Sequence, residues 1–357
     1  MADLFDDLAF RGQIHQETDP EALRKHCNST SRIVYAGFDP TSTSLTIGNL
    51  VPMILLRRFQ DAGHRPVVVM GGGTGLIGDP SGKEAERALR THEEIEANVA
   101  AIRPIFERVL GFSGPSSARI LNNADWLGKL SFVEALRDVG KHFSINMMIQ
   151  KDSVRKRLEE REQGISFTEF SYMLLQAYDF QYLYDAHGVT VQIAGSDQWG
   201  NIVAGIELTR KARHVELYGL TAPLITKADG TKFGKTESGA VWLTADRTSP
   251  YAFYQFWLGT LDADIGRYLK TFTLFSREEI EGLTAEHEAD PGKRAAHRAL
   301  AAHMTELLHG AEAREHAEAA SRALFSGDVR GLPEATVAEV FASAPSTEHA
   351  LSELADG

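Results

Sequence analysis

The chain has 357 residues, with 37 Lys or Arg and 49 Asp or Glu, so its formal net charge is −12 at pH 7. A chain this long fits about two domains and can bury a large core without disulfides or a structural metal. The single cysteine excludes a disulfide framework and any multi-cysteine zinc site. The sequence shows no signal peptide. It also shows no apolar run of the ~18 residues that a membrane span needs. We therefore expect a cytoplasmic protein that binds neither membranes nor DNA.

Strand-like and helix-like segments alternate in the first two thirds of the chain. We expect strands at 32–36, 66–70, 119–121 and 189–194. We expect helices at 48–62, at 93–110 with an interruption near Pro104, at 132–143, from about 168, and from the last strand to about 214. Strands interleaved with helices predict a parallel sheet with crossovers, that is, a doubly wound Rossmann-like α/β domain.

The pattern changes near residue 220. Residues 221–244 are rich in Lys, Gly and Thr and are expected to form a loop. Ser249 and Pro250 then open a helical region as N-cap and first-turn proline. The expected organisation is an α/β domain over 1–220, a linker over 221–247, an α-helical domain over 248–325 and an acidic tail over 326–357.

A glycine-rich loop follows the second expected strand. The segment Gly73–Gly78 fits G-x-G-x-x-G, which is typical of dinucleotide-binding sites. A turn sequence follows where a helix should continue, and Asn98 stands where an acidic residue is expected. Two other interpretations therefore remain. The segment is either a surface loop or a loop that lets the backbone approach a ligand, with Asp79 projecting into the site.

A hydroxyl-rich loop joins the first strand to the next helix. Thr41, Thr46 and Asn49 can donate hydrogen bonds to an anion near the helix start, and Gly37 and Gly48 allow close backbone approach. Helix starts favour phosphate because their N–H groups lack partners. An ordinary capped helix is the alternative.

The helix near residue 168 carries a polar row. Ser166 and Glu169 fit a capping box. Tyr172, Gln176 and Asp179 then share one helix face. This face either contacts solvent or lines a site for a small polar ligand.

Two further segments carry polar or basic groups. Asp197 and Gln198 follow the strand at 189–194, where ligands of open α/β sheets bind. A capped turn is the alternative. Lysines alternate with glycines over 227–236, either in a mobile loop that brings positive charge to phosphates or in an exposed basic hairpin.

Together these segments resemble the bacterial tyrosyl-tRNA synthetases, which are class I aminoacyl-tRNA synthetases. The matching strings occur in the family's order across residues 30 to 330. They are YAGFDPT at 35–41, GLIGDP at 75–80, FTEFSY at 167–172, GSDQWGN at 195–201 and KFGKT at 232–236.

The resemblance implies a tyrosine-binding site. Tyr35 and Asp179 would hydrogen-bond the phenolic oxygen of the substrate. Gln198 would face its carboxylate. The residues implied to hold its ammonium group are Asp79, Tyr172 and Gln176.

The resemblance also implies residues for ATP and for the leaving pyrophosphate. The implied ATP-binding residues are Gly37, Asp39, Gly48, Gly195, Asp197 and Lys235. The implied catalytic residues come from three places. Thr41, Thr46 and Asn49 belong to the family's first signature segment, and Lys232, Lys235 and Thr236 belong to its second signature segment. The other two are Lys83 and Arg87. Mg²⁺ would arrive with ATP, and no tightly bound, protein-ligated metal is expected.

The sequence departs from the family at two places. Thr46 stands where the first signature usually has His, and Asn49 replaces its last His. The chain ends in an acidic stretch where bacterial relatives continue into a basic RNA-binding domain, so we expect tyrosine activation with weak, salt-sensitive tRNA charging.

The expected activity is ATP-dependent formation of tyrosyl-adenylate and transfer of the tyrosyl group to tRNA(Tyr), by a homodimer. Three alternatives are a catalytically impaired RNA-binding paralog, a tyrosine-adenylating enzyme with another acceptor, and an NAD-dependent dehydrogenase. The basic residues considered for tRNA phosphates, or as a solvated helix face, are Lys151, Arg155, Lys156, Arg157, Arg210, Lys211 and Arg213.

Overall fold

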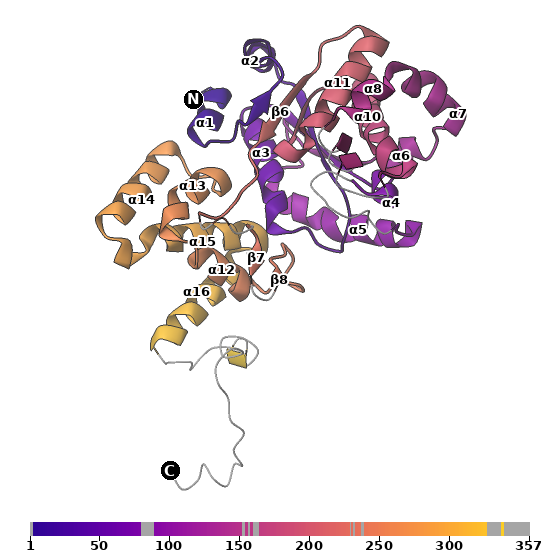
Figure 1. Ribbon diagram of the computed structural model, residues 1–357. Coiled ribbons are helices and arrows are strands. Elements are labelled where there is room, and N and C mark those ends of the chain that lie inside the picture. Colours follow the sequence, from indigo (N-terminus) through magenta and orange to yellow (C-terminus); the bar gives the residue numbers. More distant parts are fainter. Residues whose placement is uncertain are drawn as a thin grey trace, which may run out of the picture.

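The computed structural model shows an α/β part and a helical part side by side, drawn from indigo to pink and from orange to yellow (Figure 1). It describes residues 3–79, 89–151, 154–155, 158–159, 164–228, 230, 233–236, 239–326 and 337–338. The acidic tail expected over 326–357 therefore lies almost entirely outside the described residues.

The α/β part is built on a six-stranded sheet in the order β1-β6-β5-β2-β3-β4. Neighbouring strands are parallel except for β1, which pairs antiparallel with β6. The strands are β1 (Gln16–Glu17), β2 (Ile33–Phe38), β3 (Arg65–Met70), β4 (Arg119–Asn122), β5 (Val189–Gly195) and β6 (Tyr218–Ala222). A separate hairpin consists of β7 (Lys235–Thr236) and β8 (Gly239–Ala240).

Helices cover both faces of the sheet, which confirms the expected doubly wound fold (Figure 1). In the α/β part they are α1 (Leu4–Phe10), α2 (Pro20–Ser29), α3 (Leu50–Asp61), α4 (Thr74–Ile77), α5 (His92–Val109), α6 (Ala124–Leu127), α7 (Phe132–Glu134), α8 (Ile145–Ile149), α10 (Phe167–His187) and α11 (Trp199–Arg213). Short 3-10 turns are η1 (Ile47–Asn49), η3 (Gly140–His142) and η4 (Ser196–Gln198), and η2 (Ala135–Val139) is a π-helix.

Each sheet face has its own apolar core. On one face, α3 and α5 pack against side chains such as Val34, Val68 and Ile193. On the other face, α10 contributes Phe180 and Leu183. Strands buried on both faces explain why β3 appears in the sequence as a continuous apolar run.

The helical part follows β8 and shares its core with the α3 face of the sheet. It consists of α12 (Pro250–Leu258), α13 (Asp262–Phe272), α14 (Arg277–Ala289), η5 (Pro291–Lys293), α15 (Ala295–His309) and α16 (Ala311–Ser326). None of the helices that the structure describes combines the length and apolar character of a membrane span.

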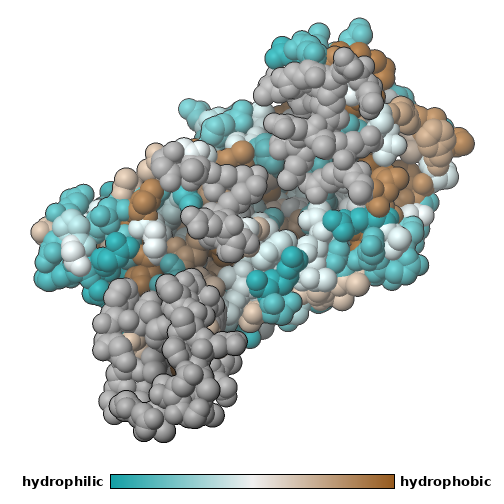
Figure 2. All heavy atoms as spheres, turned by 60° about the horizontal axis from the view of Figure 1, so that its bottom comes forward, coloured by the Kyte–Doolittle hydropathy of each residue, from teal (hydrophilic) through white to brown (hydrophobic). Residues whose placement is uncertain are grey.

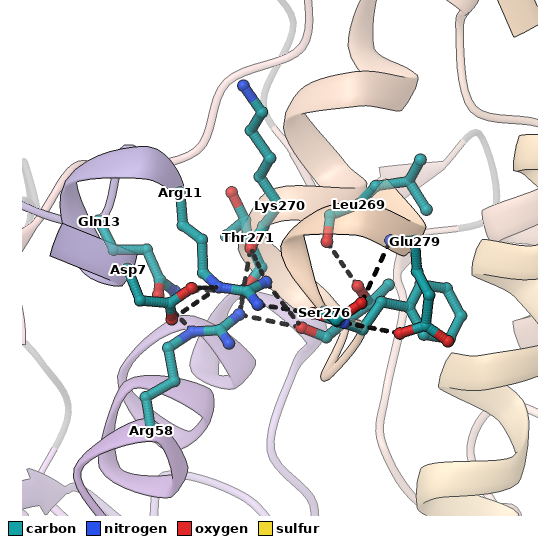
Figure 3. Close-up of polar contacts among 11 residues, drawn as sticks. Asp7, Arg11, Gln13, Arg58, Leu269, Lys270, Thr271, Ser276 and Glu279 are labelled. Carbon is teal, nitrogen blue, oxygen red and sulfur yellow. Dashed lines mark hydrogen bonds and ion pairs between the residues drawn. The ribbon is translucent and has the colours of Figure 1, made fainter. Parts of the chain in front are cut away.

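Two buried arginines join the α/β part to the C-terminal end of α13 (Figure 3). Arg58 of α3 donates to the carbonyls of Lys270 and Thr273 at 3.1 and 3.0 Å, and Arg11 donates to the same carbonyls at 3.1 and 3.3 Å. Gln13 accepts from Nε of Arg58 at 2.6 Å. The last carbonyls of a helix have no partner within the helix, so these cations satisfy groups that would otherwise be buried unpaired. We call this set the arginine clamp.

Several sequence-based expectations were wrong in detail. α5 runs unbroken through Pro104, because this residue is exposed and the carbonyl that it frees, that of Ala100, also lies on an exposed residue. The expected helix at 132–143 is a series of short helical, π and 3-10 turns. The expected loop at 221–244 contains the end of β6 and the β7–β8 hairpin, and the glycine-rich loop contains α4. The sequence analysis did not anticipate α1, β1 and α2.

The arginine clamp predicts a large effect of Arg58→Ala on stability. The substitution removes charged donors from several buried carbonyls and should lower the free energy of unfolding by about 3 kcal/mol. Urea unfolding measures this change. Arg103→Ala, which removes an exposed contact to Glu107, is the control and should change it by less than about 0.5 kcal/mol. Equal values for both variants would contradict the role given to the clamp.

Candidate functional site

The candidate site lies at the carboxyl ends of β2 and β5, where the strand order reverses. From β2 the chain continues to β3 and β4 on one side, whereas β5 pairs with the other side of β2 and leads to β6. Asp39 follows β2, and the exposed Asp197 follows β5. Open α/β sheets bind ligands at such a switch point.

A buried carboxylate forms the floor of this region. Asp179 of α10 is 4% exposed. Its Oδ2 accepts from Nδ2 of Asn123 at 2.9 Å, and its Oδ1 accepts from Nε1 of Trp126 at 2.7 Å. Burial raises the pKa of Asp179 to about 7, although both hydrogen bonds oppose the shift.

Hydrogen bonds continue from Asp179 to the end of β2. Nδ2 of Asn123 also donates to Oγ1 of Thr74 at 3.0 Å, and Thr74 donates to Oδ1 of Asp39 at 3.0 Å. Oδ2 of Asp39 accepts from the Tyr172 hydroxyl at 3.3 Å. This buried chain, which we call the Asp39–Asp179 network, joins the ends of β2 and β4 to α4 and α10.

Gly71 leaves the space that the network needs. A Cβ atom at this position would lie 2.1 Å from Oδ1 of Asp39 and 2.6 Å from Oγ1 of Thr74. Any side chain here would push these two groups apart. This glycine of the glycine-rich loop therefore allows close packing around a polar cluster.

Tyr35 of β2 places a second phenol in the buried region. The residue is 2% exposed, and its ring packs edge-on against Phe180 with centroids 5.2 Å apart. Its hydroxyl has no hydrogen-bond partner among the described residues. Burial, and next the negative charge of Asp179, hold the pKa of Tyr35 well above its usual value. A buried hydroxyl without a partner near a carboxylate can serve a ligand that carries a hydroxyl.

Gln198 gathers polar groups at the end of β5. Its Nε2 donates to Asp79 at 2.7 Å and to Asp197 at 3.2 Å. Its Oε1 accepts from Asn201 at 3.0 Å. The structure thus brings together Asp79 and Gln198, two of the residues that the resemblance implies for tyrosine binding. Gln176 lies half-buried on α10 between Tyr172 and Asp179.

The first signature segment is a tight turn at the start of α3. Oδ1 of Asn49 accepts from the backbone N–H and the hydroxyl of Thr46, at 3.0 and 3.1 Å. Thr46 thus uses its hydroxyl proton within the turn, whereas we expected it to donate to an anion. Gly37 and Gly48 are exposed, and Thr41 donates its backbone N–H to the carbonyl of Asp39 at 2.9 Å.

The second signature segment is held against the first. Ile47 donates its N–H to the carbonyl of Val241, and Val241 donates to that of Gly234, both at 3.0 Å. Gly234 has φ +78°, and a Cβ atom there would lie 2.5 Å from Cγ2 of Ile47. The ring of Phe233 stacks on Phe272 of α13, with centroids 5.2 Å apart. Phe233 and Gly234 therefore anchor the segment between the two parts of the molecule.

Several expected residues lie outside what the structure describes. Lys83, Arg87 and Lys232 are among them, as are Lys156 and Arg157. For Lys235 and Thr236 the backbone is described as β7, which pairs with β8.

Most of the described basic candidates are bound to groups within the chain. Lys151 donates to the carbonyl of Gly200 at 2.5 Å, and burial lowers its pKa to about 8. Arg210 and Lys211 pair with Glu207. Arg213 pairs with Asp185 at 2.7 Å, and Arg155 is exposed.

Thr74, Asn123 and Trp126 were missed by the sequence analysis. Asn123 directly follows β4, so the rule that ligands bind beyond the carboxyl ends of strands could have found it. No local pattern marks Thr74 or Trp126, because their partners are distant in sequence.

Comparison with known proteins points to one family. The family described as tRNA synthetases class I (W and Y) matches residues 28–326. The chain is 54% identical to a tyrosine–tRNA ligase of Bacillus caldotenax, over 97% of this chain and 83% of the relative. It is 52% identical to tyrosine–tRNA ligase 1 of Bacillus subtilis, over 98% and 82% of the two chains.

Solved structures agree with this similarity. A C-terminally truncated mitochondrial tyrosyl-tRNA synthetase of Aspergillus nidulans superposes with a TM-score of 0.83 at 30% identity, covering 91% of this chain and 95% of the other. A tryptophanyl-tRNA synthetase of Plasmodium falciparum, with a TM-score of 0.60 at 13% identity over 94% and 87% of the two chains, shows the fold alone.

The raised pKa of Asp179 predicts that the stability of the chain depends on pH. This pKa is raised from 3.8 to about 7 in the folded chain. Between pH 4 and 7 the folded state therefore binds a proton that the unfolded state has released. The contribution of Asp179 to the free energy of unfolding therefore falls as the pH rises through that range. This change in the pKa of Asp179 corresponds to a loss of roughly 4 kcal/mol of stability across the range.

The difference in unfolding free energy between the original chain and Asp179→Asn measures this contribution. It should fall from pH 4 to 7 and level off above, whereas Asp185→Asn, an exposed change in the same helix, should not produce this fall. A difference that is flat across the range would show that Asp179 is not perturbed by burial.

Proposed function

The chain belongs to the class I tRNA synthetases of the tyrosine and tryptophan type, and from this premise we propose that it is a tyrosine–tRNA ligase. It activates L-tyrosine with ATP and transfers the tyrosyl group to tRNA(Tyr). The observation that carries tyrosine as the substrate is that one buried region holds both the Asp179 carboxylate and the Tyr35 hydroxyl, which has no partner among the described residues.

The amino acid binds with its phenol inward. Its hydroxyl donates to Asp179 and accepts from Tyr35. Asp79, Tyr172 and Gln176 hold the ammonium group. Gln198, which bonds Asp79 at 2.7 Å, faces the carboxylate. A phenol contacts Tyr35 and Asp179 together, whereas phenylalanine leaves the Tyr35 hydroxyl without a partner and gives Asp179 no donor besides Asn123 and Trp126.

ATP binds across the ends of β2 and β5. Exposed Gly37, Gly48 and Asp197 and the half-buried Asp39 and Gly195 leave this edge open to the nucleoside. Asp197 contacts the ribose. Mg²⁺ arrives bound to the phosphates as part of the substrate.

Activation requires positioning and charge stabilisation, without a covalent enzyme intermediate. A carboxylate oxygen of tyrosine attacks the α-phosphorus of ATP, the bond to the β-phosphate bridging oxygen breaks, and pyrophosphate takes the charge. Helix-start donors and cations stabilise that charge where it develops. The residues in this role are Thr41, Thr46, Asn49, Lys83, Arg87, Lys232, Lys235 and Thr236. The hydroxyl of Thr46 must first leave Oδ1 of Asn49, to which it donates at 3.1 Å.

The activated tyrosyl group then passes to tRNA. A hydroxyl of the terminal ribose attacks the carbonyl carbon, and AMP leaves. The phosphate contacts come from basic residues, namely Lys151, Arg155, Lys156, Arg157, Arg210, Lys211 and Arg213. Those at the end of α11 must exchange their present carboxylate partners for phosphate.

A second copy of the chain covers an apolar face. The end of the molecule that carries α7 and α8 shows hydrophobic residues at its surface (Figure 2). They are Phe132, Val133, Leu136, Ile145, Met147, Ile149 and Phe167, between 41% and 70% exposed. Exposed apolar patches of this kind mark interaction sites, and homodimers bury such faces. The mass of a single chain in sedimentation equilibrium would contradict the dimer.

ATP–pyrophosphate exchange with each of the twenty amino acids tests the proposed activity. Only tyrosine should support rapid exchange. Charging of tRNA(Tyr) by the same preparation then distinguishes a tRNA ligase from an enzyme that transfers tyrosine to another acceptor. Exchange driven by tryptophan or by no amino acid would refute the proposal.

Asp179→Ala should relax discrimination between tyrosine and phenylalanine. A site built for a hydroxyl rejects the analogue that lacks it by about 10⁵, a value that comes from this same enzyme family and not from the present structure. Without the carboxylate, the ratio of the two kcat/KM values should fall by roughly 100-fold or more. Asp185→Asn is the control and should leave the ratio unchanged, and an unchanged ratio in Asp179→Ala would show that the pocket is assigned wrongly.

Lys232→Ala and Lys235→Ala should slow adenylate formation and leave tyrosine binding nearly intact. Their charges act on the leaving pyrophosphate, so each loss should lower kcat by about 100-fold while the KM for tyrosine changes little. Lys227→Ala, earlier in the same loop, controls for the loss of a lysine. Parallel losses of tyrosine affinity and of the adenylation rate would argue against the proposal that these two lysines act on the leaving pyrophosphate.

A further inference from the structure

Three side chains of metal-ligand type converge in the helical part, apart from the site described above. Asp262 is the first residue of α13, His287 lies near the end of α14 and His297 lies near the start of α15. One ligand atom from each lies within 4.8 Å of the other two. Oδ1 of Asp262 is 3.2 Å from Nε2 of His297 and 3.8 Å from Nε2 of His287.

Both imidazole rings are buried with unused hydrogen-bonding capacity. His297 is 0% exposed and His287 is 7% exposed. Among the described residues, both ring nitrogens of His297 and Nδ1 of His287 have no hydrogen-bond partner. Buried polar groups are rarely left unsatisfied, so two such rings facing one carboxylate call for an explanation.

The backbone near His297 also suits a metal ligand. The carbonyl of Thr260 interacts with His297 without reaching full hydrogen-bond geometry. A backbone carbonyl is a usual partner for the second ring nitrogen of a metal-bound histidine.

We propose that Asp262, His287 and His297 bind one divalent transition-metal ion of the Zn²⁺ class, with water completing the coordination. Tetrahedral Zn²⁺ holds N and O ligands at about 2.0–2.2 Å, which places the ligand atoms roughly 3.3–3.6 Å from one another. The distances of 3.2 and 3.8 Å to Asp262 bracket this spacing. Two imidazoles and a carboxylate suit Zn²⁺ and similar ions better than Mg²⁺ or Ca²⁺.

The guanidinium of Arg294 lies close to the proposed metal site. Nη1 of Arg294 lies 3.8 Å from Oδ1 of Asp262, at the outer limit of an ion pair, while its Nη2 donates to the carbonyl of Leu258 at 2.5 Å. Leu258 therefore holds the guanidinium, and the ion replaces Arg294 as the main counter-charge of Asp262.

The bound ion joins three helices. It ties the start of α13 to the end of α14 and the start of α15, while the arginine clamp holds the other end of α13. Phe272 of the same helix stacks on Phe233 in the second signature segment. The site is therefore structural, and its ion steadies the helix on which that segment rests.

Metal titration of the full-length, untagged chain tests this proposal. After EDTA treatment and its removal, Co²⁺ should bind with one equivalent per chain and give the visible absorption of a low-symmetry site, and Zn²⁺ should displace it. Asp262→Asn, His287→Gln and His297→Gln should each weaken Zn²⁺ binding at least about tenfold. Zn²⁺ should raise the Tm of the original chain and not that of Asp262→Asn.

His316→Gln is the matched control, because it removes an exposed histidine of α16 and should bind Zn²⁺ as the original chain does. Asp262 is 59% exposed, so Asp262→Asn should fold even if the buried histidine variants do not, as circular dichroism will show. The absence of stoichiometric binding, or equal Zn²⁺ affinity in the original chain and Asp262→Asn, would overturn the proposal.

Discussion

The burial of one carboxylate, that of Asp179, constrains most of the site around it. A carboxylate removed from water must find donors, and Asn123 and Trp126 supply them at 2.9 and 2.7 Å. Asn123 then fixes Thr74, and Thr74 fixes Asp39 at the end of β2. One electrostatic requirement therefore sets the relative positions of two strand ends and two helices. The pocket proposed for tyrosine and the edge proposed for ATP share this network, so in this account amino acid specificity and nucleotide placement have a common physical origin.

A second constraint holds the two signature segments together. The arginine clamp fixes the C-terminal end of α13 against α3, and Phe233 inserts beside Phe272 of that helix. Gly234 lies against Ile47 in a left-handed conformation that only glycine adopts easily. Phe233 and Gly234 thus give this part of the segment a fixed position between η1 and α13.

The sequence predicted those features that depend on local patterns. Alternating apolar runs indicated the sheet, and the polar face of α10 indicated Tyr172 and Asp179 as neighbours in a site. Interactions between distant segments could not be predicted, because backbone carbonyls, such as those bound by Arg58, leave no trace in the sequence. The same holds for His297 and its two proposed co-ligands, which lie on three helices and form no motif. The glycine-rich loop was visible in the sequence, yet the reason for the glycine at position 71, the space for Asp39, required the structure.

Isothermal titration of tyrosine in buffers of different ionisation enthalpy tests most directly whether the buried carboxylate recognises the phenol. With a pKa of about 7, Asp179 is partly protonated in the free protein at pH 7. A phenol that donates to its oxygen stabilises the ionised form, so binding should release a fraction of a proton. The account predicts heats that change with the buffer for the original chain and not for Asp179→Asn. Binding without proton release in the original chain would contradict it.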